Sequence, residues 1–268
     1  MKAIVCVKQV PDTSGKVAVN PDGTLNRASM ETITNPDDLN AVEAALKLKD
    51  ETGCKVVVVT MGPPPAEGML RELLARGADE AVLVSGREFG GSDTYATSQI
   101  LAAAVKKIAD QDDEEYIVFC GRQAIDGDTA QVGSQIAEKI GIPQISYAAE
   151  VKKEGNTVTV KRMLEDGYMT IQAKTPCLIT CIKELNVPRY MSLSGIMDCY
   201  AKPLTVYDYE ALKDDPLIEP DTIGLKGSPT NIFKSFTPPQ KGKGKMLEGA
   251  DKNTCETLAA ELLKKHII

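Results

Sequence analysis

The chain of 268 residues is 43% hydrophobic and 26% charged, so it can bury a core of ordinary size as one large domain or as one domain with an appendage. Its formal net charge of -7 excludes non-specific nucleic-acid binding, which needs a cationic surface. The first apolar run, residues 3–7, is too short for a signal peptide or a membrane span, so we expect a cytoplasmic protein that binds neither nucleic acid nor membrane.

The first half of the chain alternates between short apolar strands and amphipathic helices. Strands are predicted over residues 2–7, 56–59, 81–84 and 116–120. The intervening helices are predicted over residues 36–52, 67–76 and 92–109, the first with a cap and a proline at its start. Strands so continuously apolar predict an α/β fold, in which helices cover both faces of a mostly parallel sheet.

Two loops at the carboxyl ends of predicted strands are rich in hydrogen-bond donors. Residues 119–133, FCGRQAIDGDTAQVG, run from a strand through small and acidic residues into a helix. Residues 85–97, SGREFGGSDTYAT, add paired glycines and a Ser-Asp-Thr cap. Ligands commonly bind at the carboxyl ends of parallel strands, and the N-terminus of a helix is a favourable binding site for phosphate. Both loops are therefore candidate phosphate cradles, although an α/β domain also needs glycines and caps for purely structural turns.

The pattern changes in the second half of the chain. Residues 148–153 and 157–163 flank Glu154-Gly155-Asn156 as a hairpin, and extended residues continue to 182, which predicts an antiparallel addition to the sheet. The residues after 207 are rich in proline and end in the basic run 241–245. A helix is then predicted over residues 254–268. We divide the chain into a nucleotide-binding domain, residues 1–207, and an extended arm with a C-terminal helix, residues 208–268, that docks on a partner subunit.

Cysteine and histidine usage argues against a metal site or a catalytic triad. The seven cysteines are scattered, mostly within apolar runs, and are expected to be buried reduced thiols. The one histidine, His266, lies near the C-terminus. We predict no metal and no catalytic side chain.

Five motifs in this order resemble the small (beta) subunit of electron transfer flavoproteins. They are VKQVPD at residues 7–12, NPDDLNAVEAAL at 35–46, TMGPP at 60–64, GRQAIDGDTAQVG at 121–133 and LNVPRYMSLSGIM at 185–197. The resemblance implies an adenine-nucleotide-binding, Rossmann-like fold and a heterodimer with a large (alpha) subunit. It also implies that this chain holds either AMP or a second FAD.

The resemblance, together with the donor-rich loops, assigns the cofactor site to strand ends and helix starts. The assigned residues are Cys6, Asn35, Pro36, Asp37, Asp38, Met61, Gly90, Gly91, Ser92, Asp93, Thr94, Thr97, Cys120, Gly121, Gln123, Asp126, Gly127, Asp128, Thr129, Ala130, Gln131, Val132 and Gly133. Leu193 falls on the position that in the family docks on a partner dehydrogenase, within a loop and short helix over residues 188–197; a core leucine is the other interpretation.

The small residues of GDTAQVG and the Gly90 to Thr94 segment favour FAD over AMP, because they leave room for a larger cofactor. With FAD, similarity implies that the complex takes hydride from NADH and bifurcates the electrons to an acyl-CoA dehydrogenase-like flavoenzyme and to ferredoxin or flavodoxin. The chain would then be an electron-carrier subunit, redox-active only within a complex. Two alternatives are a simple electron shuttle with AMP in this subunit and a nucleotide-binding regulatory protein.

Overall fold

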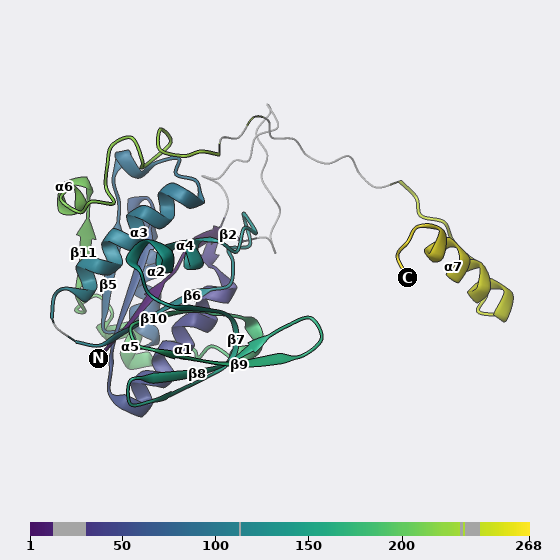
Figure 1. Ribbon diagram of the computed structural model, residues 1–268, viewed down its shortest axis with the longest axis horizontal. Coiled ribbons are helices and arrows are strands. Elements are labelled where there is room, and N and C mark those ends of the chain that lie inside the picture. Colours follow the sequence, from purple (N-terminus) through teal and green to yellow (C-terminus); the bar gives the residue numbers. More distant parts are fainter. Residues whose placement is uncertain (13–30, 113, 231–232, 234–241) are drawn as a thin grey trace.

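The computed structural model describes residues 1–12, 31–112, 114–230, 233 and 242–268. Within these ranges nine strands form one sheet in the order β11-β5-β4-β1-β6-β10-β7-β8-β9 (Figure 1). In chain order these strands are β1 (Lys2–Cys6), β4 (Lys55–Met61), β5 (Glu80–Val84), β6 (Tyr116–Gly121), β7 (Gln144–Glu154), β8 (Thr157–Met163), β9 (Tyr168–Lys174), β10 (Cys177–Cys181) and β11 (Leu204–Tyr207). A separate antiparallel pair joins β2 (Gln9–Pro11) to β3 (Thr32–Thr34).

The described residues also form seven α-helices and three short 3₁₀ turns. They are α1 (Pro36–Thr52), α2 (Glu67–Arg76), α3 (Thr94–Ala109), α4 (Val132–Ile140), α5 (Leu193–Asp198), α6 (Tyr209–Leu212) and α7 (Lys252–Lys264), with short 3₁₀ turns η2 (Pro64–Ala66), η3 (Arg87–Phe89) and η4 (Lys183–Leu185). Among the described helices, none has the length and apolar character needed to cross a membrane.

Alternate side chains of the central strand β1 pack on opposite faces of the sheet. Ala3 and Val5 belong to a core cluster with α1 and α2, whereas Ile4 and Cys6 belong to a second cluster with α3 and α4. All four are buried, as expected for a strand with both faces covered. The predicted α/β fold, with helices on both faces of a mostly parallel sheet, is confirmed.

The chain reverses its path across the sheet at β1. It passes from β1 through α1 to β4 and through α2 to β5, and α3 then crosses the opposite face to reach β6 on the other side of β1. Connections that leave neighbouring parallel strands in opposite directions open a crevice between their carboxyl ends. The fold therefore places its natural ligand-binding crevice between β1 and β6.

The predicted antiparallel addition is confirmed in β7, β8 and β9 at one edge of the sheet. The next strand, β10, leaves that addition and lies between β6 and β7, parallel to both. All five of its residues are buried, which explains why its sequence, CLITC, is apolar throughout instead of alternating. The opposite edge is closed by β11, a four-residue strand that the sequence analysis did not predict.

The segment after β11 begins by packing on the domain. Leu212, Ile218 and Ile223 are buried in the core cluster that contains α3 and α4. The terminal helix α7, in contrast, has no residue buried against the rest of the described chain. The division of the chain at residue 207 and the docking of residues 208–268 on a partner stay predictions, and Pro238, Pro239 and Lys241 of that stretch lie outside the described residues.

Candidate nucleotide site

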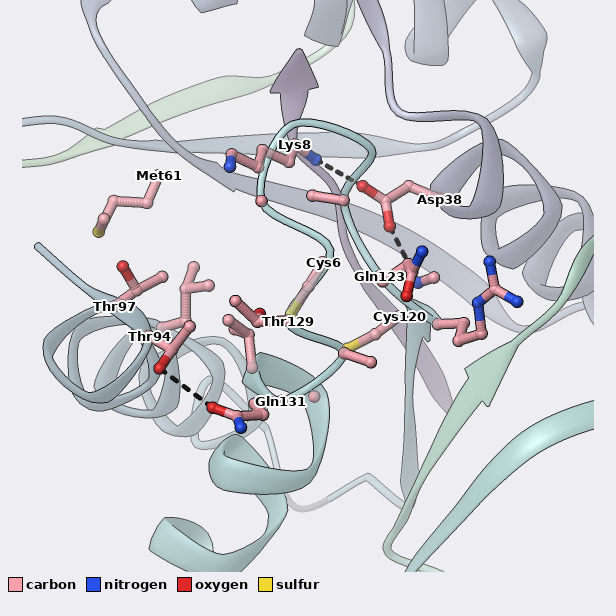
Figure 2. A pocket seen from close by; sticks show the side chains of 18 of the residues that line it. Cys6, Lys8, Asp38, Met61, Thr94, Thr97, Cys120, Gln123, Thr129 and Gln131 are labelled. Carbon is pink, nitrogen blue, oxygen red and sulfur yellow. Dashed lines mark hydrogen bonds between the residues drawn. The ribbon is translucent and has the colours of Figure 1, made fainter. Parts of the chain in front are cut away.

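A cavity of about 350 Å³ lies where β1, β4 and β6 end and where α3 and α4 begin (Figure 2). Cofactor and small-molecule sites have volumes of roughly 300–1,000 Å³. The position matches the crevice that the topology creates between β1 and β6. It is therefore the candidate ligand site.

Most residues that the sequence assigned to the site meet here. Those that line the cavity are Cys6, Asp38, Met61, Ser92, Asp93, Thr94, Thr97, Cys120, Gly121, Gln123, Gly127, Asp128, Thr129, Ala130, Gln131, Val132 and Gly133. The other assigned residues, Asn35, Pro36, Asp37, Gly90, Gly91 and Asp126, lie outside this lining. A role of the lining residues in binding a cofactor stays a prediction.

The two predicted phosphate cradles meet at the cavity, where the starts of α3 and α4 lie side by side. Asp93 caps α3 by accepting a hydrogen bond from the Ala96 N–H at 3.1 Å, and Gln131 stands at the N-cap of α4. The Thr94 hydroxyl lies 3.5 Å from Gln131 Oε1, which joins the two helix starts (Figure 2). The positive ends of both helix dipoles thus lie at the same space and favour a negatively charged group there.

The Asp38 carboxylate joins the ends of β1 and β6. It accepts the Lys8 N–H at 2.8 Å and the Gly121 N–H at 2.9 Å, one on each oxygen (Figure 2). Burial raises the pKa of this carboxyl to about 7, although the same hydrogen bonds favour the ionised form. Asp38 therefore holds the two strand ends at a fixed separation on the wall of the cavity.

Asn35 and Pro36 act from behind the cavity wall. The Asn35 side chain is fully buried, donates to the Gln123 carbonyl oxygen at 2.8 Å and accepts the Ile125 N–H at 3.1 Å. Pro36 occupies the first turn of α1, where a missing N–H costs nothing. These residues shape the loop after β6 without lining the cavity.

Ion pairs explain why two assigned aspartates do not line the cavity. Both oxygens of Asp126 lie 2.8 Å from Lys8 Nζ, so this carboxylate points at the lysine on the cavity rim. Asp37 Oδ2 lies 3.3 Å from Arg122 Nε. Burial raises the pKa of Asp37, and the Arg122 guanidinium opposes that shift. Each pair leaves a cation, Lys8 or Arg122, on the lining.

Two cysteines, Cys6 and Cys120, lie side by side on the wall of the cavity. Cys6 and Cys120 are register partners on β1 and β6, and both are buried free thiols (Figure 2). The neighbouring Cys6 thiol and burial raise the pKa of Cys120, so it carries no charge near neutral pH. The expected buried thiols are present in the core strands, whereas Cys255 is exposed on α7.

Small residues and unusual backbone angles define the loop after β6. Asp128 and Ala130 have φ values of 49° and 53°, in the left-handed region that non-glycine residues rarely adopt. The Gln123 side chain donates to Asp128 Oδ1 at 2.9 Å and so helps to hold this turn. Such local strain is typical of binding loops, where it fixes backbone groups in position.

Five lining residues were missed from the sequence: Val7, Lys8, Leu101, Arg122 and Ala124. Lys8 and Arg122 lie within the motifs already noted, next to assigned residues. Leu101 follows Thr97 by four residues and therefore shares its helix face. Neighbouring positions and helical spacing were thus available as signals, but only the structure shows which side chains turn inward.

Leu193 begins α5 on a separate surface and is 77% exposed. Val187, Tyr190, Met197 and Tyr200 are exposed beside it in sequence, and we call these five residues the α5 surface. The core interpretation of Leu193 is therefore wrong. An exposed apolar cluster of this kind is typical of protein contact sites, and the docking role stays a prediction.

Comparisons of the sequence with known proteins all indicate the same family. A family model described as "Electron transfer flavoprotein domain" matches residues 22–212. The chain is 70% identical to the "Acryloyl-CoA reductase electron transfer subunit gamma" of Anaerotignum propionicum and 52% identical to the "Caffeyl-CoA reductase-Etf complex subunit CarD" of Acetobacterium woodii, with 100% of each chain covered. It is 48% identical to the "Electron transfer flavoprotein subunit beta" of Clostridium acetobutylicum, again over 100% of both chains.

Proposed function

Because the chain belongs to the electron transfer flavoprotein family and matches a beta subunit along its full length, we propose that its cavity binds FAD. Together with an alpha subunit, the chain takes hydride from NADH. The complex then divides the electrons between an acyl-CoA dehydrogenase-type flavoenzyme and ferredoxin or flavodoxin.

The convergence of two helix N-termini on one cavity carries the proposal. α3 and α4 begin side by side at the cavity, and Lys8 and Arg122, which are paired with Asp126 and Asp37, also line it. A dinucleotide carries two adjacent phosphates, which N–H groups and cations of this kind neutralise. Gly127 and Ala130 on the lining have little or no side chain, and a Cβ on Gly127 would meet nothing within 4 Å, which favours a bulky cofactor such as FAD.

The proposed partners follow from the relatives. Two of them are named as subunits that serve an acryloyl-CoA reductase and a caffeyl-CoA reductase. Both names specify a reductase whose substrate is an acyl group carried on CoA, so we propose an acyl-CoA dehydrogenase-type flavoenzyme as the electron acceptor, in contact with the α5 surface. Within the chain, the lining holds and orients the cofactor, and FAD supplies the redox chemistry when it is bound.

Counting nucleotides tests the proposal directly. The chain is co-expressed with its alpha subunit, the heterodimer is extracted in acid, and FAD and AMP are quantified against protein. The proposal predicts two FAD per heterodimer and flavin bleaching by NADH under anaerobic conditions. One FAD with one AMP and no reaction with NADH contradicts it in favour of the simple shuttle, and a heterodimer without flavin, whose properties respond to ATP, contradicts it in favour of a regulatory protein.

A further inference from the structure

Residues 224–230, at the root of the C-terminal arm, are hydrogen-bonded to the turn that precedes α3. The Leu225 N–H donates to the Gly90 carbonyl oxygen at 3.0 Å. The Thr230 N–H donates to Asp93 Oδ2 at 2.9 Å, and the Asp93 N–H donates to Ser228 Oγ at 2.8 Å. The segment that leads into the arm is therefore bonded to one of the two phosphate cradles.

Ser228 is the buried centre of this contact. Its side chain is 6% exposed, and its hydroxyl donates to the Gly224 carbonyl oxygen at 2.7 Å while it accepts the Asp93 N–H. The hydroxyl also lies 3.4 Å from the Gly91 carbonyl oxygen. One side chain thus fixes a turn of the arm root and the backbone of the cradle at the same time.

The two segments approach so closely that they can hardly move independently. Gly224 has φ of 62°, and a Cβ on it would overlap with the Glu88 carbonyl oxygen. A Cβ on Gly91, which has φ of 75°, would lie 3.0 Å from Leu225 Cβ. Glycine at both positions permits direct backbone contact between the arm root and the turn.

Asp93 connects this contact to the cavity. One of its oxygens caps α3 through the Ala96 N–H, and the other accepts the Thr230 N–H of the arm root. Asp93 and its neighbours Ser92 and Thr94 line the cavity. A change in the position of residues 228–230 therefore reaches the N-terminus of α3 through the backbone N–H and the carboxylate of Asp93.

The preceding part of the arm is held along α3, which makes the root a fixed support. The Gln99 side chain donates to the carbonyl oxygens of Leu217 and Thr222 at 3.3 and 3.2 Å. Lys106 forms a 2.8 Å ion pair with Asp215. Up to residue 230, the final contacts of the arm root with the turn before α3 are those that Ser228 and Thr230 make with Asp93.

We infer that Ser228 and Asp93 are positioning residues that couple engagement of the arm by the partner subunit to retention of the nucleotide. The inference rests on the proposed function, because it takes the cavity as the nucleotide site and residues 208–268 as the arm that docks on the alpha subunit. Docking of the arm holds the root in place and preserves the geometry of the cradle. By thermodynamic reciprocity, bound nucleotide then strengthens association of the subunits by the same factor.

The first test compares nucleotide release from the heterodimer. S228A removes the hydroxyl, and S228T retains it. Loss of one buried hydrogen bond corresponds to about three- to tenfold faster release, which we expect for S228A; S228T is expected to restore slow release. T222V removes a hydroxyl that bonds to the Glu219 carbonyl oxygen, just before this segment, and is the matched control, with release at the wild-type rate.

A second variant keeps the test decisive if S228A fails to fold. D93N retains one oxygen for the cap of α3 but replaces the oxygen that accepts the Thr230 N–H, so we expect faster release here too. Wild-type release rates in both S228A and D93N would overturn the inference. Equal release from S228A and S228T would also overturn it, because packing and not the hydroxyl would then decide the rate.

The second measurement tests directly whether nucleotide binding and subunit association are coupled. The dissociation constant of the two subunits is measured with and without nucleotide in the wild type and in S228A. We expect nucleotide removal to weaken association in the wild type and to have a smaller effect in S228A, whereas an equal effect in both overturns the inference. A complex whose beta subunit carries no nucleotide contradicts the proposed function itself, which separates the two failures.

Discussion

At the scale of single residues, the site depends on the close contact between Gly121 and the start of α1. The Gly121 N–H bonds to Asp38 Oδ1, and a Cβ on Gly121 would lie 2.7 Å from the backbone carbon of Asp37. Only glycine lets β6 approach α1 so closely. The same contact places the buried Asp38 carboxylate at the edge of the cavity.

Substitution G121A is expected to destabilise the fold by about 1–3 kcal/mol, the usual cost of forcing a methyl group into a packed site. Urea denaturation measures the loss. Gly127 lines the same cavity, but a Cβ on it would meet nothing within 4 Å, so G127A serves as the control with wild-type stability. Equal stability of G121A and G127A would contradict the steric argument.

Asp38 is expected to make stability depend on pH. Its pKa is about 7 in the fold against an ordinary value of 3.8, so the folded state retains a proton that the unfolded state has lost over this range. The contribution of Asp38 to the free energy of unfolding is fully present below pH 3.8 and is lost as the pH rises to about 7.

Substitution D38N removes this titration, and the free energy of unfolding should then fall less steeply between pH 4 and pH 7, about the pKa range of the group. Urea denaturation at closely spaced pH values measures the slope. D166N, which removes the charge of an exposed aspartate between β8 and β9, is the matched control. Parallel curves for wild type and D38N would show that another group governs this range.

At the scale of elements, helix α1 supports both the cavity and the α5 surface. Its first turn carries Asp38, and further along Asn40 donates to the Asn186 carbonyl oxygen at 2.8 Å. Glu43, which is buried, accepts the Arg189 N–H at 3.0 Å and lies 2.9 Å from Arg189 Nε. The loop that leads into the α5 surface is therefore anchored on the helix that shapes the cavity.

Substitution E43Q should loosen this loop while the helix stays folded. Hydrogen bonds to charged groups are worth about 1.5–3 kcal/mol, so we expect the Arg189 amide to exchange with deuterium roughly tenfold faster or more. D50N is the control, since Asp50 meets the same guanidinium from the solvent side and does not bond to that amide. Unchanged exchange in E43Q would assign the order of the loop to Asn40 and Asn186 instead.

At the scale of the whole molecule, the chain presents apolar side chains that its own described residues do not cover. Leu258 and Leu263 are exposed on α7, and residues of the α5 surface are exposed at another part of the fold. Apolar side chains on a helix without buried residues are expected to pack on another protein. α7 is the better candidate for the alpha subunit because it follows the arm.

Substitution L258D should weaken association with the alpha subunit and leave the sheet domain intact. Thr257 is exposed on the side of the helix away from Leu258, Leu262 and Leu263, so T257D adds the same charge away from the apolar face. Analytical ultracentrifugation of the co-expressed chains measures the heterodimer fraction. If both variants lowered it equally, charge or helix propensity and not the apolar face would be responsible.

Some strands of the sheet could be predicted from the sequence and others could not. The strands β1, β4, β5 and β6 were predicted because each is a short apolar run between helical patterns, and the hairpin of β7 and β8 had its turn residues. The position of β10 was not predictable, since an apolar run states that both faces are covered but not which neighbours cover it. The four-residue strand β11 was too short to show a period.

By itself, the sequence determined the α/β fold, the two donor-rich loops and the family, because apolar periodicity and short motifs are local properties of the chain. Tertiary structure decided that β1 and β6 are neighbours, that Asp38 bridges them and that Asp126 faces Lys8 and not the cavity. It also decided that Ser228 meets Asp93 across 135 residues. Contacts of this kind depend on strand order and on the direction of single side chains, which no local pattern encodes.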